Sequence, residues 1–486
     1  MSEYQNWMGR EVMSKKVWRI SQCLFIVVLL VSLIYCSTSQ SLWLDEVFSL
    51  NLVDHSWGDM FDLAKADVHP PLYYVILKLF VSIGKMWTDD IIFWGKLCSS
   101  IPFFLCFFLL GRKIEKSYGN LVAGLLCIFL AGMPNVLDYA VEIRGYAWGM
   151  FFVTGAYLAG ENINSQDKWY KSWLPFTLYA VLAAYIHYFA CLAVGVIYIG
   201  LLIRNFRKTG FVKIWVISVL AAVVAYLPWL FVFLSQLKTV IGDYWIEEVT
   251  LQSIYSYFRF LFEPRMDTFH VDMICGILLA VSYFALLILS FKNRKCRVSN
   301  WGLWGSMALI ATVLFGVAAS LLIRPIFVSR YMIVAIGCFW FCYAWMIGEN
   351  RKKKILVTFV LALSAVICCI NFGQFVRWEY KKKGYYEETS EVIRQIDRSD
   401  IVLAEGEHMQ GCLSYYLGGR EILPLEVLKD ILEMTEFPEG TVVWCFDTEN
   451  EESIQAEEIE NEYLDVEELG QYHLEYDTFS IIKLIL

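Results

Sequence analysis

The chain of 486 residues is 58% hydrophobic and only 18% charged, whereas charged residues make up about a quarter of an ordinary soluble domain. This composition excludes a soluble globular protein and indicates an integral membrane protein that crosses the bilayer many times. The formal net charge is −9 and the basic residues are scattered in short clusters, which excludes a nucleic-acid partner because such a surface needs a continuous basic stripe.

Apolar runs long enough to cross a hydrocarbon core as a helix recur along the chain and predict about eleven spans. The first is expected to be a retained anchor, because further spans follow it. The predicted spans are residues 17–38, 91–110, 119–134, 147–162, 172–187, 189–203, 213–235, 271–291, 301–323, 331–348 and 355–372. The 14 cysteines lie mostly inside apolar runs and form no CxxC pair, so we interpret them as small packing residues.

Short basic clusters fall in alternate loops, at residues 112–116, 168–171, 204–208, 292–297 and 351–354. Because cytoplasmic loops carry the excess of Lys and Arg, they predict a cytoplasmic N-terminus and an extracytoplasmic C-terminus. If the apolar stretch 73–86 crossed the membrane, every one of these basic loops would lie on the outer side. The stretch is also short for a crossing. We therefore expect it to lie in the outer interface, within a first outer loop that also holds a juxtamembrane helix after Ser56.

After residue 376 the chain becomes polar. A helical pattern at 387–396 and strand-like runs at 401–404, 441–446 and 479–485 predict a small α/β domain on the outer side. The acidic stretch 447–468 is expected to be a solvated surface or loop. The predicted fold class is an α-helical polytopic membrane protein with a C-terminal α/β soluble domain, divided into residues 1–376 and 377–486.

Asp45 and Glu46 follow the first span and are flanked by Trp43, Leu44 and Val47. A carboxylate held at the bilayer surface can act as a general base or bind a divalent cation such as Mg²⁺ or Mn²⁺. An interfacial acid that simply faces water is the alternative, and we favour it from these two residues alone.

Asp67 and His69 stand directly before two prolines, which fix the backbone at the entry to the interfacial stretch. Tyr74 follows within that stretch. This turn can present an acid and an imidazole as the wall of a site, or it can be a helix entry with interfacial tyrosines. The sequence supports both interpretations equally.

Glu142, Arg144 and Tyr146 lie in the short second outer loop. Ionisable side chains at the membrane edge are costly and usually pair or serve function. If the segment is helical, Glu142 and Tyr146 share one face. A structural Glu–Arg pair is the alternative to a functional role, and we favour the functional role.

His187 occupies a tight outer hairpin between two spans, and Arg330 and Tyr331 begin a later span from the outer side. Arginine offers a bidentate fork for a phosphate, although contact with lipid headgroups explains it equally well. Acids, histidines and arginines from separate outer loops could converge on a substrate with a lipid tail, a phosphate and a polar head group.

In their order along the chain, these motifs resemble a large bacterial family of multi-span glycosyltransferases related to protein O-mannosyltransferases and to the aminoarabinose transferase of lipid A. The matching pieces are WLDEVFS at residues 43–49, HPPLYY at 69–74, YAVEIRGY at 139–146, YIHYF at 185–189, YLPWL at 226–230 and FVSRY at 327–331. Relatives often carry Gln-Glu-Ala-Arg-x-Tyr in the third piece, so this chain keeps Glu, Arg and Tyr while their neighbours change.

The resemblance implies a C-type membrane glycosyltransferase fold, a polyprenyl-phosphate-linked sugar donor and an active site on the outer face. We expect transfer to an envelope acceptor (protein, lipid or polysaccharide), and our hypothesis for the mechanism is a single displacement with inversion at the anomeric carbon. Carried over by motif, Asp45 is the acid that activates the acceptor, Glu46 accompanies it and Glu142 is the second acid. A divalent cation is left open at Asp45 and Glu142, and no organic cofactor is expected. The expected donor-phosphate contacts are Arg144 and Arg330, and the expected site wall is Asp67, His69, Tyr74, Tyr146, His187 and Tyr331.

Two other classes of protein remain open from the sequence. A transporter or flippase of lipid-linked sugars would often contain internal repeats and broken helices near the bilayer midplane, whereas we see no convincing repeat and the ionisable residues gather at the outer edge. A non-catalytic envelope scaffold would not explain why acids and arginines occupy the short outer loops.

Overall fold

The computed structural model describes residues 20, 22–161, 163, 169–242, 246–266, 268–292, 300–433, 440–448, 465–475 and 477–486. The basic N-terminal residues, parts of the clusters at 168–171 and 292–297, and most of the acidic stretch 447–468 lie outside these ranges. The chain divides into two compact units. The helical unit comprises Met1–Ile34, Leu52–Asp89 and Trp94–Phe375, and the C-terminal unit comprises Tyr35–Asn51, Asp90–Phe93 and Val376–Leu486.

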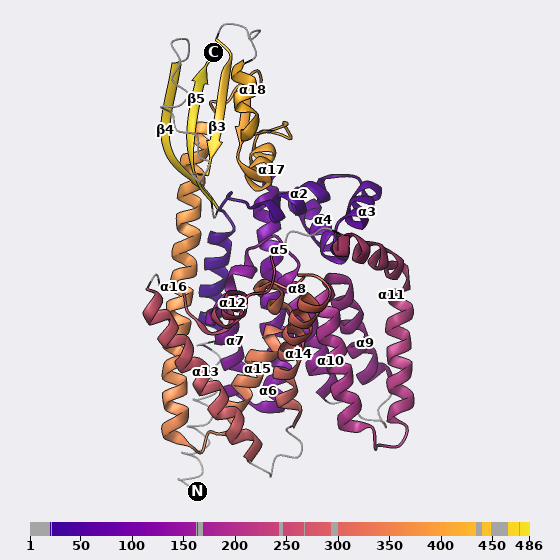
Figure 1. Ribbon diagram of the computed structural model, residues 1–486. Coiled ribbons are helices and arrows are strands. Elements are labelled where there is room, and N and C mark those ends of the chain that lie inside the picture. Colours follow the sequence, from indigo (N-terminus) through magenta and orange to yellow (C-terminus); the bar gives the residue numbers. More distant parts are fainter. Residues whose placement is uncertain are drawn as a thin grey trace. The chain divides into compact units, whose positions relative to one another are not determined.

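Helices make up the described part of the helical unit (Figure 1). Apolar runs fold in this way because a helix satisfies its own backbone hydrogen bonds without water. After a first helix at Gln22–Cys36, the helices are α3 (Trp57–Ala66), α4 (Leu72–Gly84), α5 (Ile91–Leu105), η1 (Cys106–Leu110), α6 (Gly111–Tyr118), α7 (Asn120–Gly132), η2 (Leu137–Ala140), α8 (Tyr146–Glu161), α9 (Trp169–Ile186), α10 (Tyr188–Asn205), α11 (Phe211–Gly242), α12 (Leu251–Phe262), α13 (Phe269–Lys292), α14 (Asn300–Leu322), η3 (Ser329–Met332), α15 (Ile333–Glu349) and α16 (Lys354–Ile393), which continues into the C-terminal unit.

Within the described residues, seven helices are long and apolar enough to cross a membrane, so the chain is a multi-pass membrane protein. They are Ile91–Tyr118, Tyr188–Asn205, Phe211–Val240, His270–Lys292, Trp301–Leu322, Ser329–Glu349 and Lys354–Ile393. The helices Gln22–Cys36 and α7 coincide with predicted spans but are shorter, and the predicted number of crossings stays a prediction. The stretch expected in the outer interface forms α4, an apolar helix of 13 residues.

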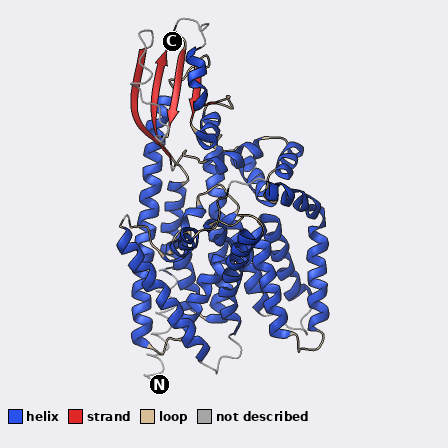
Figure 2. Cartoon of the chain, in the orientation of Figure 1, coloured by secondary structure: helices blue, strands red, loops and turns tan. Residues whose placement is uncertain are grey.

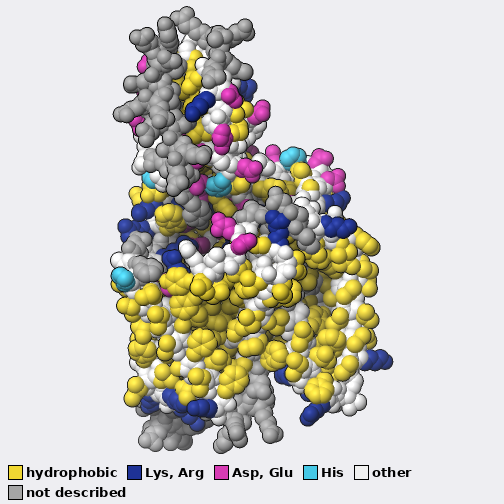
Figure 3. Space-filling view, viewed as in Figure 1, with side chains coloured by type: hydrophobic (Ala, Val, Ile, Leu, Met, Phe, Trp, Pro, Cys, Tyr) yellow, Lys and Arg dark blue, Asp and Glu magenta, His cyan; other side chains and the backbone are white. Residues whose placement is uncertain are grey.

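On the face shown in Figure 3, hydrophobic side chains form a broad band across the helical unit, with Lys and Arg side chains along its lower edge and Lys, Arg, Asp and Glu side chains above it. Inside the unit, α8, α9, α10, α14 and α15 pack side by side (Figure 1). At Gly305 of α14 an added Cβ would lie 2.5 Å from the carbonyl oxygen of Cys338 in α15. Glycine is therefore needed where these two helices meet. This packing holds the ends of α8, α9 and α10, from which the candidate site is built.

The C-terminal unit contains a five-stranded sheet of order β2-β1-β3-β5-β4 (Figure 2). The strands are β1 (Ile401–Ala404), β2 (Leu423–Pro424), β3 (Val442–Asp447), β4 (Asp465–Leu474) and β5 (Asp477–Ile485), with α17 (Gly406–Tyr416), η4 (Leu425–Val427) and α18 (Leu428–Glu433). β1 runs parallel to β2 and β3, while β5 is antiparallel to β3 and β4. Leu403, Val443, Cys445 and Leu484 form part of its buried core.

Two expectations for the C-terminal region are refined by the structure. The helix predicted at 387–396 is the end of α16, which is one continuous helix from Lys354 and ends at Ile393. The last residues of the acidic stretch are mostly exposed, as expected of a solvated surface, and they form the start of the edge strand β4, which pairs with β5. The predicted domain boundary between residues 376 and 377 stays a prediction. Two earlier segments, Tyr35–Asn51 and Asp90–Phe93, belong to the same compact unit as Val376–Leu486.

Candidate active site

The turn between α3 and α4 carries Asp67 and His69. Asp67 ends α3 with an extended backbone conformation, and Pro71 precedes the first residue of α4. His69 stands before Pro70, and a residue before proline is disfavoured in the helical conformation. The Asp-Val-His-Pro-Pro sequence therefore keeps the two polar side chains outside the flanking helices.

Asp67 is an ionised carboxylate at neutral pH. Its Oδ2 atom lies 3.0 Å from Nδ1 of His69 and accepts a hydrogen bond of 3.2 Å from the hydroxyl of Tyr74. Burial raises the pKa of Asp67, but His69 and Arg144 outweigh this effect and bring the pKa from 3.8 down to about 2. A favourable charge and a donated hydrogen bond both stabilise the carboxylate form.

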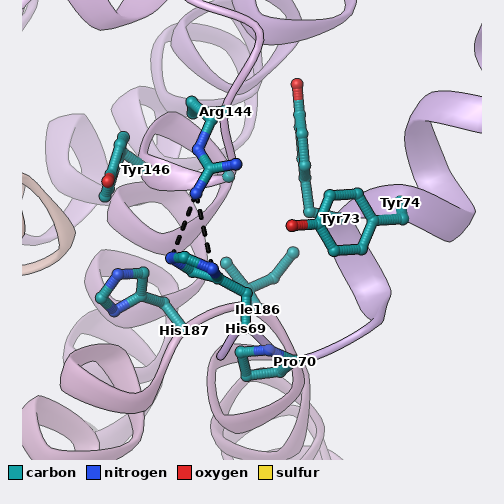
Figure 4. A pocket seen from close by; sticks show the side chains of 9 residues that line it. His69, Pro70, Tyr73, Tyr74, Arg144, Tyr146, Ile186 and His187 are labelled. Carbon is teal, nitrogen blue, oxygen red and sulfur yellow. Dashed lines mark hydrogen bonds between the residues drawn. The ribbon is translucent and has the colours of Figure 1, made fainter. Parts of the chain in front are cut away.

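Arg144 contacts the other side of the same imidazole (Figure 4). Its Nη2 atom lies 3.1 Å from Nε2 of His69 and 3.5 Å from Nδ1. A carboxylate can only accept a hydrogen bond and a guanidinium can only donate one. His69 is therefore neutral in this arrangement, with its proton on Nδ1 toward Asp67 and its Nε2 lone pair toward Arg144.

Replacing Asp67 by Asn should lower the free energy of unfolding at pH 7 by about 2 kcal/mol, which is the equivalent of its pKa shift. The pKa is depressed in the folded protein, so this stability is present above the unfolded pKa of 3.8 and is lost as the pH falls toward about 2. Thermal unfolding of both proteins in detergent, from pH 7 down to about pH 3, checks this. A difference that stays constant over that range would contradict this stabilisation of the Asp67 carboxylate.

His187 offers a buried hydrogen-bond donor. It lies between α9 and α10, and its Nδ1 atom accepts a hydrogen bond of 3.1 Å from the backbone N–H of Phe189. The proton of the neutral imidazole must then be on Nε2. That atom has no hydrogen-bond partner among the described residues, and the residue is only 5% exposed. A buried donor without an acceptor is uncommon, so a ligand oxygen is its natural partner.

Aromatic rings hold His187 in place. Its ring centroid lies 5.0 Å from Tyr331, 5.5 Å from Tyr146 and 6.0 Å from His69. Phe189 stacks on Tyr331 at 5.1 Å. The candidate residues expected from the sequence did not include Phe189, although the aromatic content of the YIHYF motif was a signal for it. This packing restricts the imidazole to one orientation before any ligand arrives.

These side chains line a small pocket that is partly open to solvent. Its wall combines the donors of Arg144 and His187 with apolar and aromatic surface (Figure 4). The lining residues are His69, Pro70, Tyr73, Tyr74, Arg144, Gly145, Tyr146, Ile186 and His187. An arginine and an N–H donor among apolar walls fit an anionic group attached to an apolar chain.

The structure places Asp45 and Glu46 in the C-terminal unit, in the first turn of α2 (Leu44–Asp54). Glu46 is buried, and its Oε2 atom accepts a hydrogen bond of 3.3 Å from the backbone N–H of Trp43. This is the hydrogen bond by which a glutamate at the third helical position caps its own helix. Glu46 thus has a structural task, whereas Asp45 is only half-buried.

The expected helical face shared by Glu142 and Tyr146 is not formed. α8 begins only at Tyr146, and the N–H of Arg144 donates to the carbonyl oxygen of Glu142 at 2.7 Å. Such a tight turn is incompatible with a helix at these residues. Arg330 lies in η3, directly before Tyr331.

The structure does not supply a metal site by itself. Among the described residues, no group of three or more His, Cys, Asp or Glu side chains is placed to hold a metal ion. Asp45 belongs to the C-terminal unit and Glu142 to the helical unit. No chemical step proposed below depends on a cation.

Comparisons with known proteins identify the fold. No protein-family profile matches the sequence, and no curated protein sequence matches it significantly. The crystal structure of ArnT from Cupriavidus metallidurans in the apo state matches with a TM-score of 0.60 over 95% of this chain and 97% of ArnT, at 12% identity. The chain has the ArnT fold. The resemblance seen in the sequence is thereby confirmed at the level of the C-type glycosyltransferase fold.

Two further structures were matched. ArnT from Cupriavidus metallidurans bound to undecaprenyl phosphate has a TM-score of 0.58 at 12% identity, with the same coverage of 95% and 97%. An oligosaccharyltransferase from Archaeoglobus fulgidus in complex with Zn and sulfate covers 74% of this chain and 54% of its own, at 11% identity, with a TM-score of 0.36. Of these three structures, the two of ArnT establish a shared fold.

Proposed function

We propose that this protein is a membrane glycosyltransferase that moves a sugar from a polyprenyl-phosphate-linked donor to an envelope acceptor on the outer face. The observation that carries the proposal is the pocket in which Arg144 lies beside the buried, unpartnered Nε2–H of His187. The ArnT fold adds support, since ArnT itself has been solved with undecaprenyl phosphate.

The donor phosphate binds in this pocket. Arg144 and His187 donate to its oxygens, and the neighbouring Arg330 adds positive charge. Charge-assisted hydrogen bonds of this kind are stronger than neutral ones. The neutral His69 accepts from Arg144, so it holds the guanidinium in place without competing for the anion. The apolar side of the wall suits the first isoprene units of the lipid.

Transfer is a single displacement that inverts the anomeric carbon. Asp45 takes the proton of the acceptor hydroxyl, whose oxygen forms a bond to the anomeric carbon. The bond between that carbon and the phosphate oxygen breaks, and its electron pair stays on the phosphate, which Arg144 and Arg330 stabilise. Glu142 is the second acid of the site. These roles of Asp45 and Glu142 come from the sequence resemblance.

The active side of the membrane is the outer one. The basic clusters of alternate loops support a cytoplasmic N-terminus. Residues 377–486 then form an extracytoplasmic domain. The acceptor is a component of the cell envelope.

Replacing His187 by Phe should weaken binding of undecaprenyl phosphate about tenfold or more, because a hydrogen bond to a charged group is worth about 1.5–3 kcal/mol. Phe keeps the aromatic packing and removes only the donor. Native mass spectrometry of the detergent-solubilised protein with undecaprenyl phosphate measures this. The same change at His270, an exposed residue of α13, should leave binding unchanged. Equal affinities for His187→Phe and wild type would argue against the pocket as phosphate site.

A further inference from the structure

One face of α17 holds the segment of residues 40–44, which leads into α2, and both lie in the C-terminal unit. His408, Cys412 and Tyr416 are spaced four residues apart on α17, so they lie on one side of the helix. Nε2 of His408 accepts a hydrogen bond of 3.2 Å from the backbone N–H of Leu44. The thiol of Cys412 donates to the carbonyl oxygen of Leu42 at 3.7 Å.

Tyr416 completes the row. Its hydroxyl accepts a hydrogen bond of 2.9 Å from the N–H of Leu42 and donates one of 2.8 Å to the carbonyl oxygen of Gln40. Three side chains spaced four residues apart on α17 thus bind backbone groups of Gln40, Leu42 and Leu44, which are spaced two residues apart in the segment.

The contact of His408 is set by a second hydrogen bond. Its Nδ1 atom lies 2.6 Å from Oδ2 of Asp477, the first residue of β5. A carboxylate accepts the Nδ1 proton, which leaves Nε2 as the acceptor that Leu44 requires. The sheet of the C-terminal unit thus fixes which hydrogen bond the imidazole can make to the segment.

Leu44 is the first residue of α2, and the first N–H groups of a helix have no acceptor within it. The side chain of Glu46 accepts a hydrogen bond from the backbone N–H of Trp43, and His408 accepts one from the backbone N–H of Leu44. The backbone position at which α2 starts is therefore defined partly from within the helix and partly by α17. Asp45 follows directly.

We infer that His408 is a positioning residue, through which the C-terminal domain holds the carboxylate of Asp45 at its working place. The catalytic half of this inference rests on the proposed function of Asp45. A base must be placed within a fraction of an ångström, and a displacement of about 1 Å can cost 10²-fold in rate. The domain thereby gains a role in the transfer step without touching the substrate.

Two substitutions at His408 separate the two ring nitrogens. The side-chain amide of His408→Gln reaches the position of Nε2 and can still accept from Leu44. The amide of His408→Asn reaches only the position of Nδ1, so it keeps a donor for Asp477 and loses Leu44. We expect His408→Asn to lower kcat about 10- to 100-fold with an unchanged KM for the donor, and His408→Gln to restore most of it. His473→Asn is the matched control, since His473 contacts Thr478 and Tyr385 instead.

Two further readouts decide the inference. In the background of Asp45→Asn, adding His408→Asn should lower the rate no further, because both changes act on one carboxylate. Hydrogen exchange of the peptide covering residues 40–50, measured on the full-length protein, should speed up in His408→Asn and not in His408→Gln. Equal kcat values for wild type and His408→Asn, or an additive loss in the double variant, would overturn the positioning role. If the wild type transfers no sugar, the proposed function fails, and hydrogen exchange alone still tells whether His408 holds Leu44.

Discussion

Replacing Asp45 by Asn should nearly abolish sugar transfer while expression and membrane insertion stay normal. A positioned general base contributes about 10²–10⁴-fold to a rate, and Asn has almost the same size but cannot take a proton. The sugar that the protein transfers is first identified by mass spectrometry of envelope glycans from cells with and without the gene. Cells that carry only the Asp45→Asn variant should then lack the same sugar as cells without the gene.

Asp54 provides the control for this experiment. It lies at the end of the same helix α2, is exposed and pairs with Lys85 at 3.2 Å. Asp54→Asn should restore the glycan fully, which shows that the loss depends on one position and not on a change of charge in the helix. Near-normal glycans from the Asp45→Asn variant would remove Asp45 from the role of base.

Replacing Arg144 by Ala should weaken binding of undecaprenyl phosphate roughly 30-fold or more, because truncating one partner of a buried charge pair costs about 2 kcal/mol or more. Arg144 is only 5% exposed, so water cannot easily replace its hydrogen bonds. Arg144→Lys should recover part of the affinity, since an ammonium keeps the charge but not the bidentate fork. A titration of the detergent-solubilised protein with undecaprenyl phosphate measures both variants.

The matched control is Arg265→Ala. Arg265 is a more exposed arginine of the helical unit that pairs with Asp138 at 3.1 Å. Its loss removes the same charge from the protein but should leave the affinity for undecaprenyl phosphate within about twofold of wild type, since exposed pairs are worth about 0–1 kcal/mol. If both alanine variants lost affinity equally, the effect would be long-range charge and not a phosphate contact by Arg144.

Much of the lining of the candidate pocket could be predicted from the sequence because its residues stand in short motifs at the ends of apolar runs. Asp67, His69, Arg144 and His187 come together since the helices that follow or precede them pack in one bundle. The bond between Arg144 and His69 joins residues that are 75 positions apart. No local pattern indicates such a contact, and the sequence suggested a Glu–Arg pair or a phosphate contact for that arginine.

The C-terminal region shows a second limit. Strand-like apolar runs indicated β1, β3 and β5, whereas β4 is rich in acids and its pairing with β5 decides its conformation. The sequence of residues 40–44 does not indicate which groups bind their backbone. Their hydrogen bonds come from α17, more than 360 positions away in the case of Leu44 and His408. Contacts of this kind depend on tertiary structure and leave no periodic signal in the sequence.

The most direct test of the account is to follow a labelled undecaprenyl-phosphate-linked sugar in liposomes that contain the purified protein and an envelope acceptor fraction. The account predicts that free undecaprenyl phosphate is released in step with the labelling of the acceptor, and that Asp45→Asn and Arg144→Ala both stop the release. Movement of the intact donor across the bilayer without any release of undecaprenyl phosphate would contradict it and would instead indicate a flippase.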